Sequence, residues 1–291
     1  MDLRPIGVYD SGVGGLTVVR EISRGLPKER VIYFGDTARV PYGDRTTGEL
    51  RRFSQEIITF LKNQGSKFII AACNTTSSQV LDDIKMRFEV PVIGVLRPGA
   101  YAASKATRVG RIGVIATIGT TRSNAYEKAI REHLPEGQVF GMACPRLVPL
   151  IEEGNLDSEE TIHVLRSYLN PLVKKGIDVL ILGCTHYPYL VKHIKTIVGP
   201  GVGIIDPAEE TIKEVAVILK KLGLESTEKT GPYEFFVSGE PSRFMAVGEK
   251  LPGNEQIKAK QVNLSDLSFP FRIIRGGDDK LGTGVKKYDT V

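Results

Sequence analysis

The chain has few of the residues that build disulfide and metal sites. Its 291 residues contain no tryptophan, three cysteines and four histidines. Three cysteines cannot all pair within one chain, and reduced thiols are typical of the cytoplasm. No closely spaced cysteine pair accompanies the few histidines, as a zinc motif would require. These low counts argue against a disulfide-stapled secreted protein and against a zinc site.

Long apolar runs and blocks of one charge are also missing. No apolar stretch approaches the roughly 20 residues of a membrane-spanning helix. Residues 1–5 lead into a predicted strand without the apolar core of a signal peptide. The net charge of +5 is spread along the chain, which argues against a nucleic-acid partner. We therefore expect a cytoplasmic protein with no membrane association.

Short apolar runs alternate with segments of helical periodicity over most of the chain. Strands are predicted near residues 5–9, 31–34, 67–72 and 90–95, and the longest helix over residues 47–63. Such alternation is typical of a parallel sheet with right-handed crossovers. The sequence therefore predicts an α/β fold.

The second half of the chain repeats the plan of the first. Residues 110–117 mirror residues 5–10, and a strand that ends in a cysteine follows each at a similar distance. Two copies of one α/β unit explain this, and their facing edges would form a cleft for a small molecule. We predict two pseudo-symmetric domains, each a parallel sheet flanked by helices, with the active site in the cleft between them.

The expected domain boundaries make the first domain discontinuous. It comprises residues 1–97 plus about 208–264, because the helix after residue 207 can return to the first unit. The second domain comprises residues 98–207. The C-terminal tail, residues 265–291, lacks periodicity and motifs, and we expect it to be flexible.

Two cysteines stand at equivalent points of the two halves. Cys73 and Cys184 each follow a continuous apolar run typical of a parallel strand that is covered on both faces. Ligands bind at the carboxyl ends of such strands, where the following helices point their amino termini into the crevice. We expect a helix after each cysteine, the first near residues 77–87, to favour the thiolate.

Packing is the simplest role for a buried cysteine, and Cys144 fits that role. Cys73 and Cys184 differ from it because Asn-Thr-Thr follows the first and Thr-His follows the second. Hydroxyl and amide groups are what a site needs to hold a polar ligand. A Cys-His nucleophile formed by Cys184 and His186 is an alternative, but it leaves Cys73 unexplained. The Gly-rich turn at residues 10–15 could cradle a phosphate, but it matches neither the dinucleotide fingerprint nor the P-loop.

Proton transfer at a carbon centre explains both thiols. Inverting such a centre requires removal of a proton from one face and delivery of a proton to the other, which one immobile base cannot do. A thiol titrates near pH 8.5, so each must be tuned to act as thiolate in one direction and as thiol in the other. Asp10 and His186 are the ionisable neighbours that could tune the two sides.

Several long motifs in this order resemble glutamate racemases, cofactor-independent amino-acid racemases of bacterial cell-wall synthesis. The resemblance covers nearly all of residues 4–255. Its motifs lie at residues 7–16, 33–43, 72–77, 119–120, 148–154 and 183–188. It implies L- and D-glutamate interconversion for peptidoglycan synthesis and cell shape, with no cofactor, no metal and glutamate as the small-molecule partner. A homodimer is among the assemblies that it suggests.

The resemblance also implies roles for individual residues. Cys73 would act on D-glutamate with help from Asp10, and Cys184 would act on L-glutamate with help from His186. Glu152 matches an auxiliary carboxylate near the cleft. The positions that match substrate contacts in the family are Asp10, Ser11, Pro41, Tyr42, Gly43, Asn74, Thr75, Thr117, Thr120, Thr185 and His186.

Two rival functions remain open at this stage. Aspartate racemases are related, but their second motif usually carries Glu where this chain has His186, and they lack the loop at residues 40–43. The other rival is a protein that acts by binding a macromolecule such as a topoisomerase, which the modest basic charge does not support.

Overall fold

The computed structural model describes residues 2–251 and 257–264 of the chain. The tail that we expected to be flexible, residues 265–291, lies outside the described residues. No helix in the described part is both long enough and apolar enough to cross a bilayer.

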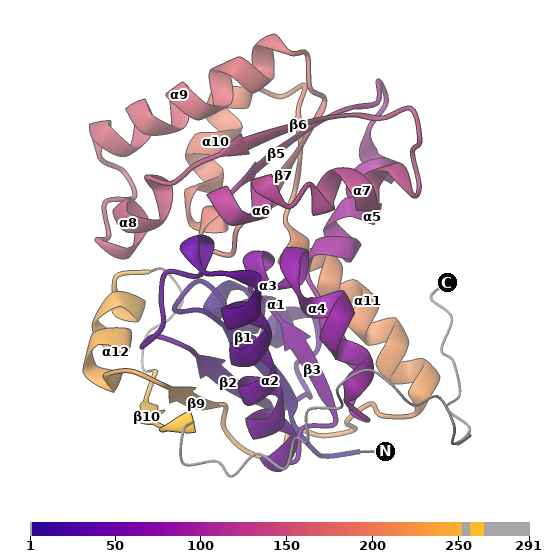
Figure 1. Ribbon diagram of the computed structural model, residues 1–291, viewed down its shortest axis with the longest axis vertical. Helices are drawn as coiled ribbons and strands as arrows, with labels where there is room; N and C mark the ends of the chain where they lie inside the picture. Colours follow the sequence, from indigo (N-terminus) through magenta and orange to yellow (C-terminus); the bar gives the residue numbers. More distant parts are fainter. Residues whose placement is uncertain (1, 252–256, 265–291) are drawn as a thin grey trace.

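Two parallel sheets form the centres of two halves of the molecule (Figure 1). The first has the order β10-β9-β2-β1-β3-β4, and the second has the order β6-β5-β7-β8. The strands of the first sheet are β1 (Ile6–Asp10), β2 (Val31–Gly35), β3 (Phe68–Ala71), β4 (Val92–Gly94), β9 (Glu234–Val237) and β10 (Ala259–Gln261). Those of the second are β5 (Arg111–Ala116), β6 (Gln138–Ala143), β7 (Val179–Gly183) and β8 (Gly203–Ile205). The order β2-β1-β3-β4 recurs as β6-β5-β7-β8, so the predicted α/β fold with two similar sheets is confirmed.

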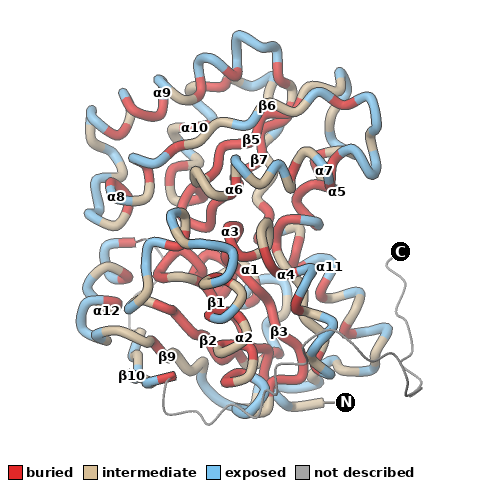
Figure 2. Tube along the Cα trace, in the orientation of Figure 1, coloured by how far each residue is buried: buried red, intermediate tan, exposed pale blue. Residues whose placement is uncertain are grey.

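Helices cover both sheets, which explains why the central strands are mostly apolar. Every residue of β1, β2, β3 and β7 is buried, and Figure 2 shows the buried trace running through both sheets. The helices are α1 (Leu16–Gly25), α2 (Thr47–Asn63), α3 (Asn74–Gln79), α4 (Leu81–Ile84), α5 (Leu96–Ala106), α6 (Ile118–Arg122), α7 (Ala125–Arg131), α8 (Leu147–Glu152), α9 (Glu159–Lys174), α10 (Val191–Val198), α11 (Pro207–Leu222) and α12 (Pro241–Glu249). The 3₁₀ helices are η1 (Tyr42–Asp44), η2 (Lys85–Arg87) and η3 (Tyr187–Leu190).

Helix α2 has the predicted bounds because its start is well marked. The side chain of Thr46 accepts a hydrogen bond from the backbone N–H of Glu49, and the Glu49 carboxylate accepts one from the backbone N–H of Thr46. This reciprocal cap satisfies amide groups that a helix end leaves without partners. Seven buried side chains along α2 then pack on the first sheet.

The segments after the two cysteines differ from the prediction. The helix expected near residues 77–87 starts earlier, at Asn74, and is broken into α3, α4 and η2. Its Asn-Thr-Thr-Ser-Ser sequence consists of poor helix formers that favour caps, so α3 is short. No α-helix starts directly after Cys184. The 3₁₀ helix η3 contains Pro188, and α10 begins only at Val191.

Two features connect the halves. Helix α11 packs against α1 and α5. Arg97 on α5 forms ion pairs with Asp82 on α4 and with Glu132 at the end of α7. The boundary that we placed after residue 97 therefore falls inside a helix rather than in a linker.

Candidate active site

Both candidate thiols lie at strand ends and are buried. Cys73 stands between β3 and α3 with 5% of its surface exposed, and Cys184 directly follows β7 with 6% exposed. Both are free thiols. Burial, the Asp10 carboxylate and, to a smaller extent, Cys184 raise the pKa of the Cys73 thiol to about 12. Hydrogen bonds from Thr76, at the start of α3, favour the Cys73 thiolate as expected, but burial and the negative charge of Asp10 outweigh them.

Asp10 ends β1 and is completely buried. Its Oδ2 accepts hydrogen bonds from the backbone N–H groups of Gly12 and Gly15 at 3.2 and 3.0 Å. Its Oδ1 has no partner among the described residues. Burial raises the pKa of Asp10, although His186 and the backbone donors act in the opposite direction. A carboxyl group held in this way can exchange a proton near Cys73.

The Gly-rich turn after β1 touches the loop that carries Cys184. A Cβ atom on Gly14 would lie 2.3 Å from Thr185 Oγ1 and 2.4 Å from His186 Nδ1, so only glycine fits this close approach. The Thr17 hydroxyl donates to the carbonyls of Gly14 and Thr185, at 2.9 and 3.1 Å. The first half therefore brings Asp10 next to the second cysteine loop. Ser11 lies half-buried in the same turn.

His186 connects Cys184 to a carboxylate. Its Nδ1 lies 3.8 Å from the Cys184 Sγ, and its Nε2 lies 3.0 Å from Glu152 Oε1. Burial alone would lower the pKa of His186, but the hydrogen bonds with Cys184 and Glu152 raise it to about 10. Burial would raise the pKa of the Glu152 carboxyl, but the hydrogen bond from His186 lowers this pKa below its usual value. An imidazolium in this place can donate to the Cys184 sulfur.

Three threonines meet between the halves. Thr75 Oγ1 on α3 lies 3.1 Å from Thr117 Oγ1 and 3.4 Å from Thr120 Oγ1, and the last two are 3.0 Å apart. A cluster of hydroxyls offers both donors and acceptors to a polar ligand. Asn74 from the first half and Cys184 and Thr185 from the second line one narrow gap.

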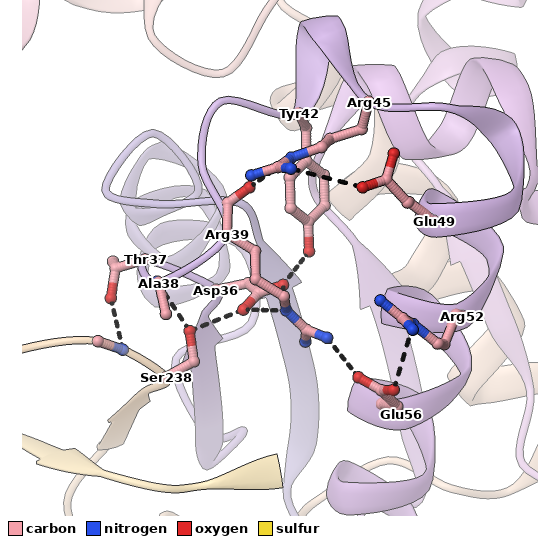
Figure 3. A network of polar contacts seen from close by, with 11 residues as sticks. Asp36, Thr37, Ala38, Arg39, Tyr42, Arg45, Glu49, Arg52, Glu56 and Ser238 are labelled. Atoms are coloured by element: carbon pink, nitrogen blue, oxygen red, sulfur yellow. Dashed lines mark hydrogen bonds and ion pairs between the residues drawn. The ribbon is translucent and has the colours of Figure 1, made fainter. Parts of the chain in front are cut away.

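The loop with Pro41, Tyr42 and Gly43 reaches the same region. Gly43 lies close to Thr117, because a Cβ atom on Gly43 would be 3.6 Å from Thr117 Cβ. Pro41, in contrast, is exposed to solvent. The hydroxyl of Tyr42 donates to the buried carboxylate of Asp36. Figure 3 shows Asp36 at the centre of a network that fixes this loop.

The network around Asp36 was not predicted from the sequence. Arg39 Nε donates to both Asp36 oxygens at 2.8 and 2.9 Å, and the Ser238 hydroxyl donates to Oδ1 at 2.7 Å. Ser238 follows β9, about 200 residues away in the chain, so no local pattern could link the two. The motif at residues 33–43 was the one feature of the sequence that marked this loop as functional.

The structure brings predicted residues of the two halves into contact at two places. Thr75 meets Thr117 and Thr120, and the turn after Asp10 meets the loop with Thr185 and His186, whereas Pro41 is exposed. In the described residues, no group of three or more His, Cys, Asp or Glu side chains could hold a metal ion. The third cysteine, Cys144, is 1% exposed and packs in the apolar core, in agreement with its predicted structural role.

Comparisons with known proteins identify relatives over most of the chain. Residues 6–215 match the family model described as Asp/Glu/Hydantoin racemase. A glutamate racemase from Geobacter metallireducens is 46% identical over 265 residues, which are 91% of this chain and 98% of that protein.

Solved structures are similar over the same extent. A glutamate racemase isoform from Bacillus anthracis is 43% identical with a TM-score of 0.86, covering 90% of this chain and 98% of that one. A glutamate racemase from Francisella tularensis, solved in complex with D-glutamate, is 37% identical with a TM-score of 0.84, covering 92% and 100%.

Proposed function

This chain belongs to the glutamate racemases of the Asp/Glu/Hydantoin racemase family, and from this premise we propose that two thiols carry its isomerase activity, the interconversion of L- and D-glutamate. The observation that carries the proposal is the pair of buried cysteines at equivalent strand ends, with Asp10 near one and His186 bonded to the other.

Each direction of the reaction uses the two thiols in opposite protonation states. The Cys73 thiolate removes the α-proton of D-glutamate, which leaves a carbanion at the α-carbon. The Cys184 thiol then donates its proton to the opposite face, and L-glutamate forms. Cys73 ends as a thiol and Cys184 as a thiolate, which is the state that begins the reverse reaction. Exchange of both protons with solvent restores the starting state.

Asp10 and His186 are proposed to move protons to and from their respective thiols. The raised pKa of the buried Asp10 brings its carboxyl closer to the range in which it can share a proton with Cys73. The pKa of His186, raised to about 10 after its hydrogen bonds with Cys184 and Glu152 overcome burial, keeps a proton beside the second thiol at neutral pH. Glu152 holds this imidazole in place through the 3.0 Å contact.

Substrate carboxylates are proposed to bind through neutral donors. The candidates are the side chains of Ser11, Asn74, Thr75, Thr117, Thr120 and Thr185 and the backbone of the loop with Pro41, Tyr42 and Gly43. None of them is Lys or Arg. Neutral donors compensate an anion without placing a full positive charge beside the thiolates.

The test of this proposal is racemisation measured by circular dichroism with no added cofactor. L-Glutamate should lose its signal as D-glutamate forms. Cys73→Ala and Cys184→Ala should each reduce turnover by at least about a thousandfold, as loss of an acid–base group does. Cys144→Ala is the matched control, because that thiol packs in the core, and it should keep ordinary turnover. Ordinary turnover after either of the first two changes would overturn the two-thiol mechanism.

Glutamate is proposed as the substrate in preference to aspartate. Donors fixed for the longer side chain would stay unpaired with aspartate, at roughly 1 to 3 kcal/mol for each buried group. Comparable specificity constants for the two amino acids would contradict this choice.

The cellular role proposed is supply of D-glutamate for peptidoglycan, and thus cell-wall synthesis and cell shape, in the cytoplasm. Depletion of the protein in its host should cause loss of shape that added D-glutamate reverses. Sedimentation of the purified protein tests whether it forms a homodimer.

A further inference from the structure

One tyrosine contacts both cysteine-bearing segments. The hydroxyl of Tyr126, on α7, donates a 2.6 Å hydrogen bond to Asn74 Oδ1, and Asn74 directly follows Cys73. The Tyr126 ring lies against Gly183, which directly precedes Cys184, because a Cβ atom there would be 3.2 Å from the ring's Cε2. Tyr126 is 4% exposed. This side chain therefore extends from one half of the molecule to the other.

The hydrogen bond determines which end of the Asn74 amide is left for a ligand. An asparagine amide has one oxygen acceptor and two N–H donors, and its partners decide how it is turned. Burial raises the pKa of Tyr126 well above its usual value, so the phenol keeps its proton and acts as donor. With Oδ1 occupied, the two hydrogens on Asn74 Nδ2 stay without a protein partner among the described residues.

Asn74 lies beside both candidate thiols, where the substrate is proposed to bind. Asn74 is 4% exposed and lines the same narrow space as Cys184. A carboxylate accepts hydrogen bonds and cannot donate them when ionised. An amide turned the other way would present its oxygen to that carboxylate and repel it.

We propose that Tyr126 is a positioning residue that holds the Asn74 amide with its N–H donors toward the substrate. Because Tyr126 and Asn74 belong to different halves, substrate binding by Asn74 depends on the correct seating of the second half on the first. This inference rests on the proposed function, since it assigns a role in glutamate binding.

The first test removes only the hydroxyl. Tyr126→Phe should raise the KM for both D- and L-glutamate by about 3- to 10-fold, the range of one lost hydrogen bond. The kcat should change by less than about twofold, because Tyr126 does not touch the reacting atoms. Tyr101→Phe is the matched control. Tyr101 lies on α5, is 49% exposed and has no hydrogen bond from its hydroxyl among the described residues, so its loss should leave both constants unchanged.

A double-mutant cycle separates positioning from general destabilisation. If Tyr126 acts through Asn74, Tyr126→Phe should have no further effect on kcat/KM in a protein that already carries Asn74→Ala. A purely structural role of the hydroxyl would lower kcat/KM by the same factor in both backgrounds. Where Asn74→Ala turns over too slowly, the same cycle is measured on the dissociation constant of D-glutamate by calorimetry.

The possible results distinguish the role of Tyr126 from the racemase activity itself. A KM effect that disappears in the Asn74→Ala background supports the inference. Unchanged KM in Tyr126→Phe, or equal effects in both backgrounds, overturns it while leaving the racemase activity intact. Absence of turnover in the unmodified protein overturns the proposed function and this inference with it.

Discussion

Removal of the charge that holds His186 should change the pH dependence of the reaction. Glu152→Gln keeps an acceptor near His186 Nε2 but removes the carboxylate that lies 3.0 Å from it. The hydrogen bonds with Cys184 and Glu152 overcome burial and raise the pKa of His186 to about 10, so the wild-type imidazolium should lose its proton only in the alkaline range. Without the carboxylate, that loss should begin at lower pH.

The size of the effect follows from the exposure of the pair. The Glu152 side chain is 38% exposed and His186 is 6% exposed. Solvent screening at Glu152 limits the coupling to about 1 kcal/mol, the upper end for an exposed ion pair. At 1.36 kcal/mol for a tenfold change, this corresponds to about 0.7 on the pH scale. In Glu152→Gln, the alkaline limb of the kcat–pH profile with L-glutamate should therefore shift to lower pH by about 0.7 pH unit.

The same pair predicts a pH dependence of stability. The pKa of His186 in the folded protein lies above its unfolded value of about 6.5. The contribution of His186 to folding stability is therefore fully present below about pH 6.5 and is lost as the pH rises through about 10. Urea unfolding should show Glu152→Gln less stable than wild type by about 1 kcal/mol at pH 6, and the difference should vanish above about pH 10.

The control for both measurements is Glu153→Gln. Glu153 is the next carboxylate along the chain, and it accepts a hydrogen bond from Asn155 rather than from His186. An alkaline limb that stays in place in Glu152→Gln, or that moves equally in Glu153→Gln, would refute the assignment of this limb to His186.

Five other substitutions probe the site and the fold. Gly14→Ala should lose at least about 100-fold in racemisation and about 1 to 3 kcal/mol in stability, because its Cβ would lie 2.3 Å from an atom of the opposite loop. Gly48→Ala, with nothing within 4 Å of the new Cβ, should retain both activity and stability in the same racemisation and urea assays. Lys67→Met should lower the free energy of unfolding in urea by about 3 to 5 kcal/mol, because it leaves the buried carboxylate of Glu29 without its cation. A loss below about 1 kcal/mol would refute this reasoning. Asp10→Asn and His186→Asn should change the kcat and KM values of D- and L-glutamate in opposite senses. Each variant should nevertheless lower kcat/KM by the same factor for both enantiomers. Matched changes in every constant for both variants would indicate that the two residues position the substrate instead.

Local patterns were sufficient for the fold and for the placement of the thiols. Continuous apolar runs identified β3 and β7, so the position of Cys73 and Cys184 at strand ends followed directly. Helix α2 was predicted with its observed bounds, and in the structure a reciprocal cap between Thr46 and Glu49 marks its start. The segment after Cys73 was harder, because its Asn, Thr and Ser residues favour caps as well as short helices.

Contacts between residues far apart in the chain could not be predicted from local patterns. The bond between His186 and Glu152 joins residues 34 apart, and the bond between Tyr126 and Asn74 joins residues 52 apart. Neither pair is marked by an unusual residue type in its own segment, so only the folded structure reveals them. His186 and Glu152 meet within the second half, whereas Tyr126 and Asn74 meet across the two halves. The pKa of Cys73 has the same origin, since burial and Asp10 raise it against the effect of the helix start.

Racemisation in D₂O tests the two-thiol mechanism most directly. The D₂O solvent deuterates both thiols, and each thiol serves one face of the substrate. At early times D-glutamate formed from L-glutamate should carry deuterium at the α-carbon, while the remaining L-glutamate should keep its protium. The reverse reaction should give the mirror result. Early deuterium in the unreacted enantiomer, measured by mass spectrometry after chiral separation, would show that one base removes and returns protons on the same face, and it would contradict the account.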